Sequence, residues 1–69
     1  MNKLILSSKI YEFNTLEDAV NEFNGLADIR LQREESYFLL NFFNCRYDIA
    51  ETMKEFENYL IELTYQTIK

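Results

Sequence analysis

The stretch Tyr-Phe-Leu-Leu-Asn-Phe-Phe, residues 37–43, decides the fold of this chain, because six of its seven side chains are apolar and none is charged. Apolar side chains at both alternating sets of positions are typical of a strand that lies at the centre of its sheet or is covered on both faces. The flanking residues are polar, since Glu34-Glu35-Ser36 precede the stretch and Asn44 follows it. Residues 37–43 are therefore predicted to form a central strand.

Two further strands are predicted on the N-terminal side of this stretch. In residues 27–32 the apolar side chains of Ala27, Ile29 and Leu31 alternate with polar ones, and the polar connection at 34–36 has the length of a hairpin loop. In residues 3–11 one face carries Leu4, Leu6 and Ile10, and the other carries Lys3, Ser7 and Lys9. A period of two in β-compatible residues predicts a strand with one buried face in each segment.

A short helix is predicted between the two N-terminal strands. Its apolar side chains recur at helical spacing, at Leu16, Ala19, Val20 and Phe23. Thr15 is expected to cap the N-terminus, because its hydroxyl can accept a hydrogen bond from the first turn. The helix is expected to end at Asn24-Gly25, with Gly25 in the left-handed conformation that helix C-termini favour.

A long helix is predicted at the C-terminal end. Asp48 and Glu51 have the spacing of a capping box at its start. One apolar stripe, expected to face the sheet, consists of Ile49, Met53, Phe56, Leu60 and Leu63, and a second line, rotated off the first, consists of Ile61, Tyr65 and Ile68. No helix breaker occurs between residues 49 and 69, so the helix can reach ~30 Å at 1.5 Å per residue.

The predicted element order is β-α-β-β-α, which defines an α+β fold in a single small domain, residues 1–69. A strand–helix–strand unit followed by a hairpin places the third strand between the first and the second, in a three-stranded antiparallel or mixed sheet. Both helices are then expected to pack on one face of that sheet.

The composition disfavours catalysis and cofactor binding. The 69 residues include no histidine, no proline, one glycine and one cysteine, Cys45. The chain therefore lacks a near-neutral acid or base, a multi-thiolate metal site and a glycine-rich phosphate loop. No enzyme activity, metal or cofactor is expected. Cys45 is interpreted as a structural thiol, since no histidine is present to activate it.

The formal net charge of −5 disfavours binding to nucleic acid, whose phosphates an acidic surface repels. Binding to a membrane surface is disfavoured as well, because the sequence contains no polybasic patch. Its longest apolar runs are far shorter than a membrane span. A cytoplasmic protein is expected.

Several large apolar side chains are left over once the two helices cover one sheet face. They are Ile5, Tyr11, Leu39 and Phe43 on the opposite face, and Ile61, Tyr65 and Ile68 near the end of the last helix. Together they would exceed the apolar patch of a few hundred Å² that is usual for a monomer. These seven residues are the candidate interface, occupied by a second copy in an isolated homodimer or by a partner protein in the cell.

Three segments carry a resemblance to a known family. They are Ile10-Tyr11-Glu12-Phe13-Asn14-Thr15-Leu16-Glu17-Asp18-Ala19, the strand Ala27-Asp28-Ile29-Arg30-Leu31, and Glu55-Phe56-Glu57-Asn58-Tyr59-Leu60 in the last helix. The chain resembles the HxsD-like family, small proteins encoded beside radical-SAM peptide maturases in the His-Xaa-Ser peptide-modification system. It departs from the family where Leu63-Thr64-Tyr65-Gln66 replaces a Leu-Arg-Glu-like ending. The resemblance implies a non-catalytic accessory protein that binds a radical-SAM maturase, a precursor peptide or both.

A second interpretation belongs to a different functional class. A small acidic protein, for instance one encoded by a mobile element, can self-associate or inhibit a target by blocking a basic surface on it. Genes for a maturase and a small peptide beside the coding sequence favour the accessory role, whereas a phage or defence context favours the inhibitor.

Overall fold

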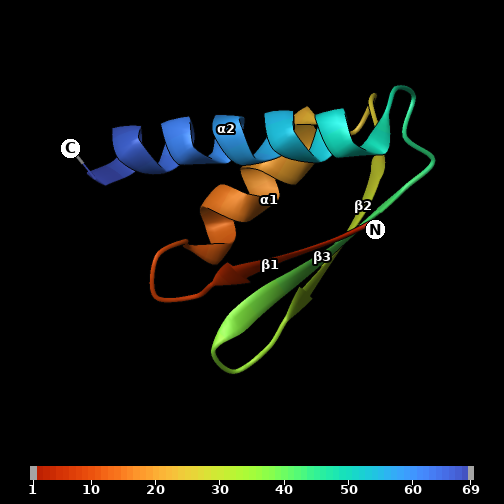
Figure 1. Ribbon diagram of the computed structural model, residues 1–69. Coiled ribbons are helices and arrows are strands. Elements are labelled where there is room, and N and C mark those ends of the chain that lie inside the picture. Colours follow the sequence, from red (N-terminus) through yellow and green to blue (C-terminus); the bar gives the residue numbers. More distant parts are fainter. Residues whose placement is uncertain (1, 69) are drawn as a thin grey trace.

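The computed structural model describes residues 2–68 of the chain, and the side chains of residues 2–66. Its elements are β1 (Lys3–Ser7), α1 (Phe13–Glu22), β2 (Asp28–Arg33), β3 (Tyr37–Phe43) and α2 (Ile49–Ile68) (Figure 1). The predicted β-α-β-β-α order, the α+β class and the long C-terminal helix are confirmed.

The sheet has the strand order β1-β3-β2, and β3 pairs antiparallel with both neighbours. In the register, Leu40 of β3 lies between Leu4 of β1 and Leu31 of β2. The prediction of a central strand at 37–43, flanked by the first and second strands, is therefore confirmed. The residues Phe38, Leu40 and Phe42 on one face of β3 are buried, whereas Tyr37 and Phe43 on its other face are exposed.

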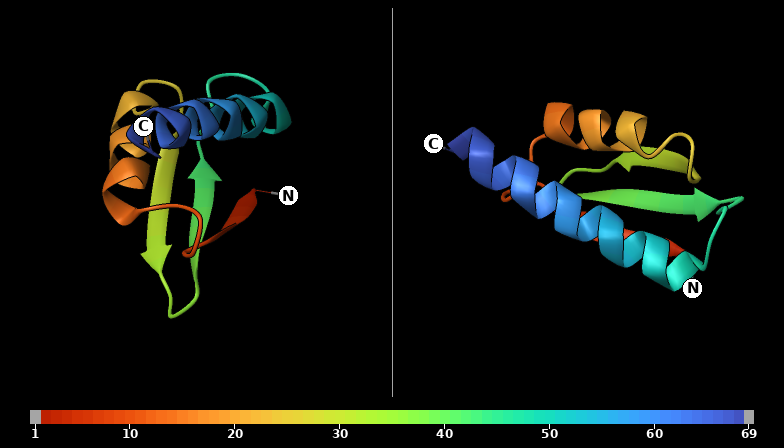
Figure 2. Two further views of the ribbon diagram at one scale, coloured as in Figure 1. Left: turned by 90° about the vertical axis from the view of Figure 1, so that its left-hand side faces the viewer. Right: turned by 90° about the horizontal axis from the view of Figure 1, so that it is seen from above.

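Both helices lie on the same side of the sheet, as predicted (Figures 1 and 2). The core between the layers consists of Leu6, Leu16, Ala19, Phe23, Ala27, Phe38, Leu40, Phe42, Phe56 and Leu60. Phe56 of α2 is fully buried at the junction of the layers. Its ring centroid is 5.2 Å from that of Phe23 and 5.4 Å from that of Phe42, both in edge-to-face geometry. Such pairs add to the free energy that area burial alone provides.

Helix α2 begins where the sequence predicts. The backbone N–H of Glu51 donates to a carboxylate oxygen of Asp48 at 3.1 Å, and the Thr52 hydroxyl donates to the Asp48 carbonyl oxygen at 2.9 Å. These bonds fix the first turn of a 20-residue helix, which at 1.5 Å per residue spans about 30 Å. The stripe from Ile49 to Leu63 faces inward as predicted, with Phe56 and Leu60 fully buried.

Strand β1 is shorter than predicted. The carbonyl oxygen of Ser7 accepts the backbone N–H groups of Ile10 and Tyr11 at 3.2 and 3.1 Å, so the chain turns at residues 8–10. Ile10, predicted for the buried face, is 64% exposed on this turn. Tyr11, predicted for the opposite sheet face, lies beyond the strand and packs against the core instead. Both placements were wrong because the alternating pattern continues past the last paired residue.

Helix α1 begins earlier than the predicted cap at Thr15. Glu12 is the N-cap residue, with extended backbone angles and no side-chain capping bond, and Thr15 lies inside the first turn. Phe13 opens the helix because its ring has tertiary partners. The Phe38 ring lies at 6.1 Å, between centroids, and the Arg33 guanidinium lies 4.4 Å from the Phe13 centroid.

The C-terminus of α1 also differs from the prediction. Gly25 does not have a positive φ. The N–H groups of Leu26 and Ala27 both donate to the carbonyl oxygen of Phe23, at 2.8 and 3.1 Å, and these tight turns lead directly into β2. The left-handed conformation occurs instead at Asn44, with φ 49°, between β3 and α2. Asparagine tolerates that region better than most residues, and the Asn44 side-chain amide donates to Asp28 at 2.8 Å.

Candidate interaction surface

The sheet has one face without a helix, which we call the open sheet face. Its apolar members are Ile5 of β1 and Tyr37, Leu39 and Phe43 of β3. Ile5 is 65% exposed, Phe43 40% and Tyr37 38%, and Leu39 is half-buried. Ile5 lies directly opposite Leu39 in the register. The strands therefore bring three of the candidate interface residues, Ile5, Leu39 and Phe43, onto one surface.

Tyr37 belongs to the open sheet face but was missing from the predicted interface. Its alternation with Leu39 and Phe43 in the central strand was the signal that could have identified it. Polar side chains complete the face, and the Arg30 guanidinium lies 5.6 Å from the centroid of the Phe43 ring. Cation–π contact of this kind holds an aromatic side chain in place while its outer surface stays accessible.

The remaining candidate residues gather at the C-terminal end of α2. Tyr11, Ile61 and Tyr65 line a groove of about 190 Å³ together with Ile10 and Thr64. Ile61 is 53% and Tyr65 67% exposed. We call this the helix-end groove. The Thr64 hydroxyl is buried in its wall, and no hydrogen-bond partner for it lies among the described residues. The side chain of Ile68, the seventh candidate, lies outside the described residues.

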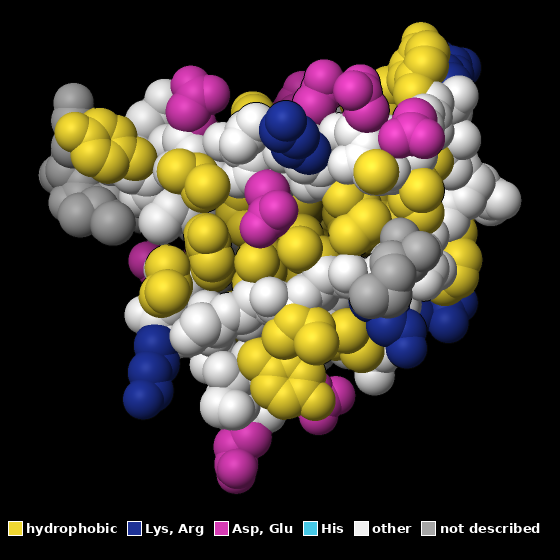
Figure 3. Space-filling view, viewed as in Figure 1, with side chains coloured by type: hydrophobic (Ala, Val, Ile, Leu, Met, Phe, Trp, Pro, Cys, Tyr) yellow, Lys and Arg dark blue, Asp and Glu magenta, His cyan; other side chains and the backbone are white. Residues whose placement is uncertain are grey.

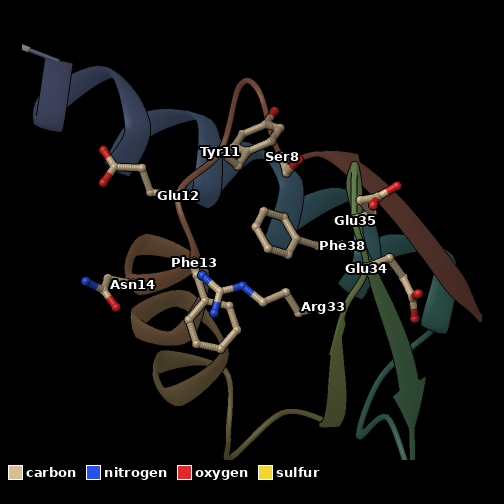
Figure 4. Close-up of a pocket in the computed structure, with 9 residues that line it drawn as sticks. All are labelled: Ser8, Tyr11, Glu12, Phe13, Asn14, Arg33, Glu34, Glu35 and Phe38. Carbon is tan, nitrogen blue, oxygen red and sulfur yellow. The ribbon is translucent and has the colours of Figure 1, made fainter.

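A larger hollow of about 390 Å³ lies where the loop after β1 and the start of α1 meet the turn between β2 and β3. Its lining residues are Ser8, Tyr11, Glu12, Phe13, Asn14, Arg33, Glu34, Glu35 and Phe38 (Figure 4). In Figure 4 the Arg33 side chain lies across the Phe13 ring. No pattern in the sequence predicted this hollow, since its residues come from two separated segments, 8–14 and 33–38.

Potential metal-ligating side chains are not clustered in the described part of the structure. No group of three or more His, Cys, Asp or Glu side chains is placed there to hold a metal ion. Cys45 is half-buried in the connection between β3 and α2 and packs against the core. An isolated thiol packed in this way behaves as a small apolar side chain.

Charge is distributed unevenly between the layers. Six exposed carboxylates lie on the helices, at Glu17, Asp18, Glu22, Glu51, Glu55 and Glu62. In Figure 3 acidic side chains gather over the outer side of α2. On the strands, Lys3 and Arg30 are exposed, and so is Asp28, which the register places on the open sheet face opposite Phe43. The outer helix surface is thus acidic, whereas the open sheet face carries charges of both signs around its apolar side chains.

Comparisons with protein-family models, with curated proteins and with solved structures each return no match for this chain. Within residues 2–68, no helix combines the length and the apolar character that crossing a membrane requires. The geometry of the surfaces therefore carries the functional argument.

Proposed function

We propose that this chain is a non-catalytic binding module that docks on a partner protein through its open sheet face. The observation that carries the proposal is the exposure of Ile5, Tyr37 and Phe43 together on a sheet face that no helix covers. Covering apolar surface stabilises a complex by about 25 cal/mol per Å² before the costs of association. A face of this kind is typical of an interaction site.

The resemblance to the HxsD-like family suggests the partner. On this proposal the chain is a cytoplasmic accessory protein in ribosomal peptide maturation and binds a radical-SAM maturase, its precursor peptide or both. In the absence of that partner, a second copy covers the open sheet face. A two-fold homodimer is the commonest closed arrangement of identical chains.

Sedimentation of the purified full chain tests this role. We expect a dimer at micromolar concentration, and a monomer for the double variant Leu39→Ser, Phe43→Ser. The matched control is Glu55→Ser, Glu62→Ser, which alters the outer surface of α2 and leaves the dimer intact. The proposal would be contradicted by two results together: the wild-type chain is a monomer, and the open-face variant Leu39→Ser, Phe43→Ser changes neither solubility nor binding to a co-expressed maturase.

The acidic outer helix surface favours one alternative function, inhibition of a target by covering its basic surface. The same two variants separate the alternatives. If the alternative holds, Glu55→Ser, Glu62→Ser weakens target binding and the open-face variant does not. A phage or defence gene context would favour this alternative, and neighbouring genes for a maturase and a small peptide would favour the accessory role.

A further inference from the structure

The outer edge of β1 presents backbone groups that no described strand pairs. At one end of β1, the N–H of Phe42 donates to the carbonyl oxygen of Asn2 at 2.8 Å, and at the other the N–H of Ser8 donates to that of Ser36 at 3.2 Å. In an antiparallel pair, residues bonded to the neighbouring strand alternate with residues whose backbone groups point away from it. The even-numbered residues of β1 therefore bond to β3, and Lys3, Ile5 and Ser7 face outward.

These outward-facing backbone groups are not all free to pair with an added strand. The carbonyl oxygen of Ser7 already accepts two bonds from the following turn. The N–H and C=O groups of Lys3 and Ile5, and the N–H of Ser7, have no further strand beside them within residues 2–68. An extended chain laid along this edge can pair with all of them, because its own donors and acceptors have the same spacing.

The other edge of the sheet, formed by β2, is less suited to strand addition. Asp28, Arg30 and Arg33 make half of its six residues charged, and charged side chains on an edge strand oppose pairing with another chain. The Arg33 side chain also packs on the Phe13 ring of α1. In β1, Lys3 is the one charged residue among five.

One flank of α2 forms a largely apolar wall beside β1, interrupted by the half-buried Glu57. Met53, Glu57, Ile61 and Tyr65 follow one another at intervals of four residues and so lie in one row on the helix. The C-terminal part of the row meets the loop after β1 in the helix-end groove. The opposite flank packs toward α1, where the ring centroids of Tyr59 and Phe23 are 5.8 Å apart. Figure 3 shows hydrophobic side chains gathered between α2 and β1.

We propose, on the basis of the function proposed above, that the outer edge of β1 binds an extended peptide segment as a fourth strand. Side chains of a strand alternate between the two faces of a sheet. Every second side chain of the bound segment therefore points to the helix side, toward Leu4, Met53 and Ile61, and is apolar. The exposed Lys3 and Lys9 stand at the two ends of β1, so the segment carries acidic residues at its ends. Its open-face side chains lie beside Ile5.

Amide hydrogen exchange of the full chain tests strand addition directly. The probe is a set of peptides selected on the folded protein from a random library displayed on phage. In the free protein, we expect the amides of Leu4 and Leu6 to exchange slowly, because they are paired with β3, and those of Lys3, Ile5 and Ser7 to exchange fast. We expect bound peptide to slow the fast set at least ~10-fold, because the new bonds must open before exchange. Failure to select any peptide, or protection of none of these three amides, would overturn the proposal.

A pair of variants at one position separates the edge from the open sheet face. Ile5→Pro and Ile5→Ala both remove the exposed isoleucine side chain, but only proline removes the outward N–H. Proline is tolerated in an edge strand where the lost N–H faces solvent. We expect Ile5→Pro to weaken peptide binding at least ~10-fold relative to Ile5→Ala. Equal binding by the two variants would contradict strand addition.

Two further variants keep the test decisive if Ile5→Pro does not fold. Ile61→Glu places a charge on the exposed apolar wall without touching the core, and is expected to weaken peptide binding while the circular dichroism spectrum stays unchanged. The open-face variant Leu39→Ser, Phe43→Ser is expected to lose the dimer and keep the selected peptides. The edge site would be rejected if neither Ile61→Glu nor Ile5→Pro weakens peptide binding. If the open-face variant loses the dimer in the same experiments, the proposed docking function still stands.

Discussion

Both faces of the sheet carry large apolar side chains, yet these side chains differ sharply in exposure. On the helix side, Leu6, Phe38, Leu40 and Phe42 are no more than 5% exposed. On the open side, Ile5, Tyr37 and Phe43 are between 38% and 65% exposed. The strands are shared, but the helices cover one side only, and polar residues such as Lys3, Asn41 and Arg30 complete the open side. A large apolar side chain of this sheet is therefore buried or exposed according to whether a helix covers it.

The largest expected effect is at the centre of the covered face. Phe56→Ala removes a fully buried ring that contacts both Phe23 and Phe42. A buried Phe→Ala change typically lowers the free energy of unfolding by ~3–5 kcal/mol, comparable to the whole stability of a small domain. Urea denaturation followed by circular dichroism measures it. Unchanged melting of Phe56→Ala would show that the helix layer is packed differently.

A matched pair on one strand gives the sharpest comparison of the faces. Leu40→Ala is expected to lower the free energy of unfolding by about 2–5 kcal/mol, because Leu40 is fully buried. Leu39→Ala, one residue away on the open sheet face, is expected to cost less than about 1 kcal/mol in the monomer. Both are measured by urea denaturation below the concentration at which copies associate. Equal losses for the two variants would mean that the open side is covered within the monomer.

The third prediction concerns the anchor of the covering helix. Asp48→Ala removes the carboxylate that accepts the Glu51 N–H. Loss of an N-cap typically costs ~1 kcal/mol. Thermal denaturation of Asp48→Ala against Asp48→Asn, which retains an acceptor, measures the contribution of the cap. If both variants melt alike and well below the wild-type chain, the negative charge rather than the capping bond stabilises the helix.

The smallest effect is expected for Cys45→Ser. The thiol is half-buried in the connection between β3 and α2, and substitutions outside the core usually change stability by less than about 0.5 kcal/mol. Both thermal stability and partner binding are expected to stay close to wild type. Complete loss of binding with an unchanged fold would assign the thiol a functional role.

The sequence predicted those parts of the fold that a local pattern determines. The apolar stretch at 37–43 coincides with the central strand β3, and the carboxylate of Asp48 is a local cap for α2. In both places the signal lies within a few residues of the feature that it predicts. The pairing order of the strands followed because a hairpin and a strand–helix–strand unit combine in few ways.

Element ends set by tertiary contacts were not predictable in the same way. Phe13 enters α1 because Phe38 and Arg33, distant in sequence, pack on its ring. Tyr11 was assigned to the sheet because its position continues the two-residue alternation of the strand. No glycine or proline marks the end of β1. The candidate surface therefore divided into the open sheet face and the helix-end groove, a separation that depends on where β1 stops.

The central position of β3 has a consequence for the order in which the sheet assembles. Its bonds to β2 close a loop of a few residues, whereas its bonds to β1 join segments separated by the whole of α1 and β2. Bringing distant segments together costs more chain entropy than closing a short hairpin. The β2–β3 hairpin is therefore expected to form before β1 docks. A newly made chain would then expose the β1-facing side of β3 until β1 docks, and during that interval another strand can compete for it.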